Sequence, residues 1–164
     1  MNRALTLALL PLAACACAAS SAAPSSSKAR PAISPAGPGP TEIVAARQAA
    51  FNLTAATFGA MKPAIEAGGD VKSLGFGARG IARWGAAMPA MFPLGSDLAT
   101  DRARPEIWTN KADFDSKAAA LTAAATALAD AAQANDKAAA ATAYAELGKT
   151  CGGCHQLYRA EAPR

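Results

Sequence analysis

Apolar side chains recur at helical spacing along most of this chain, and this periodicity limits the fold more than any other feature. Between residues 44 and 65 they lie alternately three and four positions apart, which aligns them on one face of a helix. The same spacing returns in 114–132 and 144–158, and more weakly in 74–88, where four glycines lower the helix propensity. No strand-like alternation competes. The first series consists of Val44, Arg47, Phe51, Thr54, Phe58, Met61 and Ile65.

Turn and cap residues divide these patterns into four helices. Pro63 predicts a kink in the first helix and Gly68-Gly69 its end, and Asp70 is expected to cap the second. Residues 89–108 contain three prolines and are expected to form a long loop. Asn135-Asp136 predicts a tight turn between the third and fourth helices. Four helices and three connections indicate an all-α, antiparallel up-down-up-down bundle. Its many alanines leave a small core, which points to a buried cofactor.

The last predicted helix carries two cysteines and the only histidine of the protein. Cys151 and Cys154 are three positions apart and His155 is four beyond Cys151, so all three lie on one helix face within about one turn. This Cys-x-x-Cys-His run is the attachment signal of haem c. Each thiol adds to a haem vinyl group, and the imidazole ligates the iron.

Three rival interpretations of the motif are weaker. Structural zinc requires four ligands, and residues 41–164 offer no other Cys or His. A thioredoxin-like redox pair requires a βαβ setting and a cysteine at a helix N-terminus. A structural disulfide is disfavoured because helical cysteines at i and i+3 are poorly aimed at each other.

The N-terminal residues indicate export. Residues 1–19 combine a basic start, a short apolar run and small residues, as in a signal peptide. The run "LAAC" ending at Cys15 also resembles a lipobox, so two alternatives stand: a lipid anchor at Cys15 in an exported lipoprotein, or an ordinary signal cut further on. Residues 20–40 are expected to be a disordered Ser/Pro/Ala-rich tether, and 41–164 the folded domain. We therefore expect a periplasmic protein.

The charge of the folded domain gives no sign of a nucleic-acid partner. Three of the 16 Lys and Arg residues lie before residue 41, where there is no acid, so the rest of the chain carries 13 basic against 12 acidic residues. A domain with nearly equal numbers of basic and acidic residues lacks the excess of positive charge that is typical of nucleic-acid-binding proteins.

Three segments resemble the class II cytochromes c, the cytochrome c′ family. They are "ARQAAFNLTAATFGAMKP" (46–63), "ARPEIW" (103–108) and "CGGCHQLYR" (151–159). The resemblance implies a four-helix bundle with one covalent haem c. It also implies a homodimer packed through the first two helices, which the glycine-rich second helix leaves open.

The resemblance also implies roles around the haem. Arg47 lies on an apolar face and needs a partner; the family assigns its arginine to a haem propionate, with Gln48 assisting, whereas the alternative is that Arg47 reaches water. Phe51 would cover the distal side of the iron, where it cannot act as a ligand. Arg159 would lie on the proximal side, or serve only as a charge at the helix C-terminus.

These roles predict an iron that is five-coordinate and high-spin, with His155 as its axial ligand. Such a protein would bind the small gases NO and CO, exchange electrons with an unknown redox partner protein, or do both, and it would not be an enzyme. Peroxidase activity is disfavoured because the distal side lacks an acid–base histidine. The main alternative is a low-spin, six-coordinate electron carrier with Met88 or Met91 as sixth ligand. Trp84, Trp108 and Tyr158 are expected to be core residues that border the haem at most.

Overall fold

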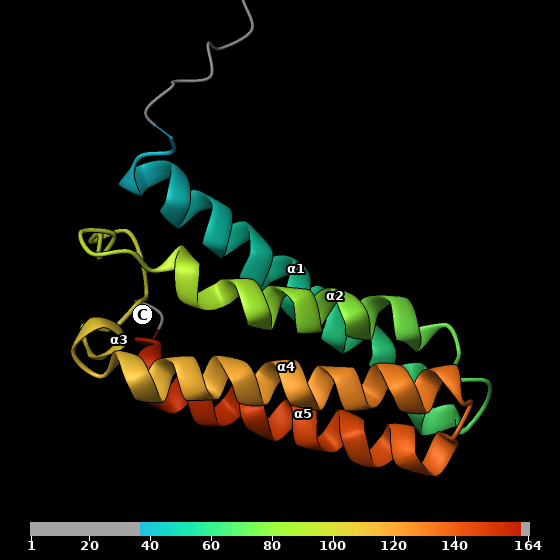
Figure 1. The fold of residues 1–164 in the computed structure, drawn as a ribbon. Coiled ribbons are helices and arrows are strands. Elements are labelled where there is room, and N and C mark those ends of the chain that lie inside the picture. The colour runs from blue at the N-terminus through green and yellow to red at the C-terminus, as the bar shows by residue number, and fades with distance from the viewer. Residues whose placement is uncertain (1–36, 162–164) are drawn as a thin grey trace, which may run out of the picture. The chain divides into compact units, whose positions relative to one another are not determined.

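The computed structural model describes residues 37–161, which form four long helices and two short ones (Figure 1). No strand occurs within this range, so the predicted all-α four-helix bundle is confirmed. The predicted signal peptide, the tether up to residue 36 and Cys15 lie outside the described residues. The helices are α1 (Pro40–Ala67), α2 (Leu74–Ala87), η1 (Met88–Met91, a 3-10 helix), α3 (Glu106–Thr109), α4 (Lys111–Gln133) and α5 (Lys137–Tyr158).

The ends of α1 follow from its sequence. Pro40 opens the helix, where its missing N–H costs nothing. The helix continues through Pro63 and ends at Gly68, which adopts the left-handed conformation with φ 60°. The Gly68 N–H donates to the Ile65 carbonyl at 3.2 Å. The predicted stop at Gly68-Gly69 is therefore confirmed, because glycine enters this conformation at little cost.

The predicted start of the second helix was wrong. Asp70 is not its cap: the Asp70 side chain accepts from the Lys72 N–H at 2.9 Å in a turn, and α2 begins at Leu74. The intervening residues bury Val71, which is 1% exposed and donates its N–H to the Asn135 side chain at 3.0 Å. This contact with the α4–α5 turn holds the segment out of the helix.

The expected loop at 89–108 also needs correction, since it contains two short helices. Met88–Met91 continues α2 as η1, and Glu106–Thr109 forms α3. Ile107 of α3 is 2% exposed, so its burial supports this turn of helix against the bundle.

Small residues bring α2 and α4 close together. A Cβ atom added at Gly85 would lie 2.6 Å from Thr122 Oγ1 and 3.1 Å from the Thr122 backbone nitrogen. Ala78 of α2 and Ala125 of α4 are fully buried. Glycine at position 85, which weakens α2 as a helix, is therefore explained by the close approach of α4.

The end of α5 is tied to the segment before α3 by main-chain hydrogen bonds. Ala103 and Arg159 form an isolated antiparallel bridge. The Arg104 N–H donates to the Tyr158 carbonyl at 3.1 Å, and the Ala160 N–H donates to the Arg102 carbonyl at 2.8 Å. None of the helices in the described range is both long and apolar enough to span a membrane.

Candidate functional site

α5 presents its two cysteines and its histidine to one cavity of about 430 Å³. Cys151, Cys154 and His155 are all half-buried, and both thiols are free. The predicted placement of the three side chains on one helix face is therefore what the structure shows. The free thiols also leave the disulfide interpretation without support.

Helices α1, α2, η1 and α4 supply an apolar wall to this cavity. Phe51 reaches it from α1, Trp84 from α2, Met88 from η1 and Phe114 from α4. The Phe51 ring packs edge-on against Trp84, with centroids 5.1 Å apart, and lies 6.3 Å from the Phe92 ring. Phe51 is thus a wall residue, as expected for a distal cover. The polar and charged lining residues are Gln48, Asn52, Thr54, Thr100, Asp101, Arg102, Lys117, Thr150 and Arg159.

Burial sets the protonation of the three α5 groups. Burial raises the pKa of the Cys151 and Cys154 thiols, an effect that nearby Lys117 reduces for Cys154. Burial lowers the pKa of His155, and the positive charges of Arg159 and Arg102 lower it further. Both thiols therefore keep their protons at neutral pH while the imidazole is neutral, the form in which histidine binds a metal.

The residues present fit a covalently attached haem. Two protonated thiols and a neutral imidazole share one cavity walled by aromatic and aliphatic side chains. Trp84 Nε1 is buried and finds no hydrogen-bond partner in the described part of the chain, as expected where a wall is completed by another group. Within residues 37–161 no three His, Cys, Asp or Glu side chains are placed to hold a metal ion directly.

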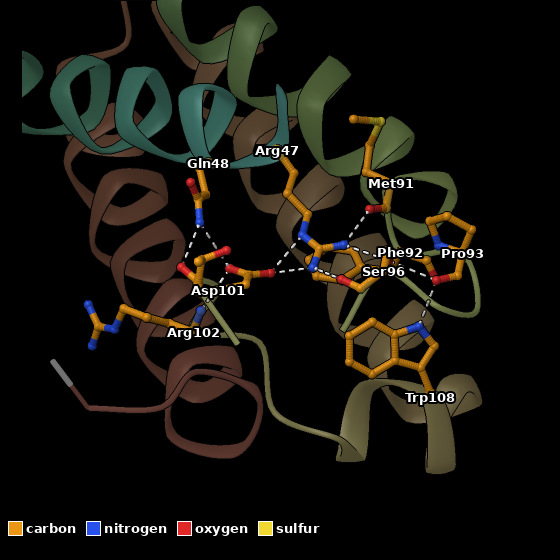
Figure 2. A network of polar contacts seen from close by, with 10 residues as sticks. Arg47, Gln48, Met91, Phe92, Pro93, Ser96, Asp101, Arg102 and Trp108 are labelled. Carbon is orange, nitrogen blue, oxygen red and sulfur yellow. Dashed lines mark hydrogen bonds and ion pairs between the residues drawn. The ribbon is translucent and has the colours of Figure 1, made fainter. Parts of the chain in front are cut away.

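Arg47 finds its partner within the chain. It is 1% exposed, so the alternative in which it reaches water was wrong. Its guanidinium forms an ion pair with Asp101 and donates to both Ser96 oxygens and to the Met91 carbonyl (Figure 2). Among the described residues it is not part of the cavity wall, whereas Asp101 is. The predicted contact of Arg47 with a propionate stays a prediction.

Sequence reasoning missed Asp101, which lies 54 positions from Arg47. The only local signal is its place just before the "ARPEIW" segment, and nothing there indicates a partner on α1. Gln48 does line the cavity. Its contacts with the Thr100 carbonyl (3.4 Å) and Asp101 Oδ1 (3.5 Å) are long, so its amide is weakly held.

Arg159 is exposed and lines the cavity beside His155. It also lines a shallower neighbouring hollow together with Arg102 and Arg104. Three arginines and Glu161 therefore line the hollow next to His155, and two of the arginines, Arg159 and Arg102, add to the effect of burial in lowering the pKa of that imidazole.

The remaining predicted border residues divide into two groups. Trp84 and Tyr158 line the cavity, and the Tyr158 hydroxyl donates to Asp113 at 2.6 Å. Trp108 is not among the lining residues of the described chain; its Nε1 donates to the Phe92 and Pro93 carbonyls, both at 3.1 Å.

Met88 and Met91, the two residues that the low-spin alternative offers as sixth iron ligand, differ in their position relative to the cavity. Met88 is 3% exposed and lines the cavity, whereas Met91 is absent from the wall formed by the described residues. Met91 instead contributes its carbonyl to Arg47 (Figure 2). If either residue reaches the iron, the geometry favours Met88.

Comparison with known proteins agrees with this site. The family model Cytochrome C' matches residues 42–159. Cytochrome c-556 of Agrobacterium fabrum is 47% identical over 76 residues, which cover 44% of this chain and 49% of that protein. The chain belongs to the cytochrome c′ family. The cofactor of this family is one covalent haem c, which agrees with the predicted cofactor.

Solved structures of the family share the fold. Cytochrome c′ from Thermochromatium tepidum superposes with a TM-score of 0.70 at 32% identity and covers 76% of this chain and 98% of its own. The nitric oxide complex of a mutant cytochrome c prime from Alcaligenes xylosoxidans superposes with a TM-score of 0.68 at 30% identity, covering 75% and 97%. A further variant of that protein is known with carbon monoxide bound.

Proposed function

We propose that the protein is an extracytoplasmic haem c protein that binds NO or CO, exchanges electrons, or does both. Cys151 and Cys154 would form the thioethers and His155 would be the axial ligand of the iron. The observation that carries the proposal is that α5 brings both thiols and the imidazole of His155 to the same cavity, while α1 contributes Phe51 to its wall. The bound haem supplies the redox and gas-binding chemistry.

The distal side of the iron is proposed to be apolar and without a second protein ligand. Phe51 has no atom that can ligate, and its ring is held against Trp84 and Phe92. Such a wall disfavours water and anions more than small neutral diatomics. The NO and CO complexes of the Alcaligenes xylosoxidans relative support gas binding for this chain.

Polar groups at the cavity rim are proposed to orient the haem. Gln48 lines the cavity with a weakly held amide that is able to donate to a propionate. Arg159 follows His155 by one turn and adds a positive charge beside the ligand. A nearby cation disfavours the ferric state, so Arg159→Gln is expected to lower the reduction potential of the haem.

Spectroscopy of the exported protein tests the proposal. Intact mass is expected to include one haem, and the optical and resonance Raman spectra are expected to show high-spin iron without ligand and a nitrosyl adduct with NO. His155→Ala is expected to keep the thioether-bound haem but to change the ligand-free spectrum. No added haem mass refutes the attachment, and an unchanged His155→Ala spectrum refutes the axial ligand.

A second candidate is a six-coordinate electron carrier, which one observation favours: Met88 lies on the cavity wall. In that case the resting ferric protein would show the sulfur-to-iron charge-transfer band, and Met88→Leu would abolish it. Met91→Leu is the matched control, since Met91 is outside the wall of the described chain. Absence of the band in the parent protein eliminates this candidate.

Export to the periplasm is proposed because haem c is attached outside the cytoplasm in bacteria and residues 1–19 have the pattern of a signal peptide. Cell fractionation and mass analysis of the mature N-terminus distinguish a signal cut after Ala14, with lipid on Cys15, from a later cut. Haem loading that persists in the cytoplasm after removal of residues 1–19 would contradict export.

A homodimer through α1 and α2 is also proposed. Leu53 on α1 and Phe76 on α2 are large apolar side chains that are 70% and 82% exposed, so both are available to an interface between two copies. Sedimentation of the loaded protein is expected to show a dimer that Phe76→Asp dissociates. The exposed Leu157 on α5 provides the control Leu157→Asp.

A further inference from the structure

Arg47 uses every hydrogen-bond donor it has within the chain. Its Nε–H donates to Asp101 Oδ2 at 2.9 Å, and Nη1 donates to Ser96 Oγ at 2.8 Å and to the Met91 carbonyl at 3.0 Å. Nη2 donates to the Ser96 carbonyl at 2.5 Å and to Asp101 Oδ2. A guanidinium has five N–H groups, so none remains for another acceptor.

The same guanidinium is enclosed by aromatic rings. Its central carbon lies 4.2 Å from the centroid of the Phe92 ring and 5.9 Å from that of Trp108. Arg47 is also only 1% exposed. Its guanidinium is therefore separated from the cavity by Asp101, the one of its side-chain partners that lines the cavity wall of the described chain.

Asp101 stands on the cavity side of Arg47. Asp101 lines the cavity and its side chain is 10% exposed, whereas Arg47 is not part of the described wall. The second carboxylate oxygen, Oδ1, accepts from the Arg102 N–H at 2.7 Å and faces the Gln48 amide at 3.5 Å (Figure 2). Arg47 and Gln48, the two residues expected to receive a haem propionate, therefore both converge on this one carboxylate.

We propose that Asp101, and not a haem propionate, is the resident anionic partner of Arg47 in the haem-loaded protein, and that its carboxylate places a fixed negative charge on the cavity wall. A propionate could reach Arg47 only by displacing Asp101 from the guanidinium and from the Arg102 N–H. Such an exchange replaces one carboxylate partner of Arg47 by another and leaves the Asp101 carboxylate without its hydrogen-bond donors. Asp101 is a positioning residue that links the loop before α3 to α1. The proposal rests on the proposed haem site.

A fixed negative charge at the wall favours the more positive ferric state of the iron. Removing it should therefore raise the reduction potential. Asp101→Asn is expected to shift the potential upward, well beyond the shift of the matched control Asp97→Asn. Asp97 lies in the same loop and is exposed, and it is not among the cavity residues of the described chain.

Equal shifts of the potential in Asp101→Asn and Asp97→Asn would overturn the proposal. Each protein is first checked for one covalent haem by intact mass. An unloaded parent protein refutes the haem site, whereas loaded variants with equal shifts refute only the role of Asp101.

A double-mutant cycle provides a readout that does not depend on the potential. Asp101→Asn is expected to lower the urea midpoint of the loaded protein in the parent background, because it leaves the buried Arg47 charge without its partner. In the Arg47→Gln background the same substitution should have little effect. If Arg47 instead holds a propionate, Asp101→Asn will have the same small effect in both backgrounds.

A crystal structure of the loaded parent protein decides the matter if the single variants fail to fold. Asp101 is expected within hydrogen-bond distance of the Arg47 guanidinium, as in Figure 2. A propionate oxygen in that position, with Asp101 turned away, would overturn the proposal.

Discussion

Phe51 of α1 meets Trp84 of α2 edge to face, with ring centroids 5.1 Å apart and ring planes at 87°. The contact fixes the Phe51 ring as part of the wall of the cavity that we propose holds the haem. Phe51→Ala removes that part of the wall and should open the distal side of the iron. We expect the association rate of CO with the ferrous protein to rise at least roughly tenfold, equivalent to a barrier lowered by about 1.4 kcal/mol. Flash photolysis measures this rate.

The control for this prediction is Leu53→Ala. Leu53 lies on the same helix, is 70% exposed and is not among the described cavity residues. The CO association rate of Leu53→Ala should equal that of the parent protein. If Phe51→Ala binds CO no faster than Leu53→Ala, Phe51 does not limit access to the iron.

Gly85→Ala is expected to destabilise the bundle by about 1–3 kcal/mol, because its Cβ would lie 2.6 Å from Thr122 Oγ1 on α4. Gly80→Ala on the same helix is the matched control. A Cβ at Gly80 meets nothing within 4 Å, so helix propensity alone should stabilise that variant by about 0.5–1 kcal/mol. Urea unfolding followed by circular dichroism measures both. Equal changes in the two variants would show that α2 and α4 are not in close contact at Gly85.

Tyr158 makes stability sensitive to alkaline pH. Burial and the hydrogen bond to Asp113 raise the pKa of Tyr158 from 10.0 to about 12. In the unfolded chain the phenol ionises first, so this contribution is complete below pH 10.0 and is lost as the pH rises to about 12. We expect the thermal midpoint to fall across this range, and to fall less steeply in Tyr158→Phe. Parallel pH profiles for the two proteins would contradict the prediction.

Asp136 caps α5, the helix that carries the thiols and the imidazole. Its side chain accepts from the Ala139 N–H at 3.0 Å. Asp136→Ala should cost about 1 kcal/mol of unfolding free energy. Asp130→Ala, at an exposed position near the end of α4, is the control and should be neutral or slightly stabilising, since an acid near a helix C-terminus is unfavourable. A loss in Asp130→Ala as large as that in Asp136→Ala would argue against the cap.

Local signals in the sequence predicted most of the fold and the shared placement of the two cysteines and the histidine on the last helix. The 3.6-residue period located the four long helices, Gly68 marked the end of α1, and the spacing of Cys151, Cys154 and His155 placed three groups on one face of α5. Each of these depends on residues within a turn or two of each other, so the sequence carries the whole signal.

The features that the sequence did not reveal, the start of α2 and the partner of Arg47, depend on contacts between residues far apart in the chain. Asp70 has the composition of a helix cap, but the burial of Val71 and its hydrogen bond to Asn135, 64 positions away, shift the start of α2 to Leu74. The Arg47–Asp101 pair likewise spans 54 positions. A need for a buried partner can be inferred from Arg47 alone, but its identity follows only from the packing.

The main-chain bridge between Ala103 and Arg159 holds the end of α5 in place and leaves the Arg159 side chain able to change during evolution. Its hydrogen bonds join main-chain atoms of residues 102, 104, 158 and 160, so these bonds do not depend on the side chain of Arg159. Arg102, Arg104 and Arg159 line the same hollow as His155. The Arg102 side chain also donates to the Ala160 carbonyl at 2.8 Å, so Arg102 contributes to the anchoring of α5. A substitution of Arg159, in contrast, changes the charge beside His155 and leaves the main-chain hydrogen bonds in place, so the electrostatics at the proposed iron ligand are able to evolve separately from the fold.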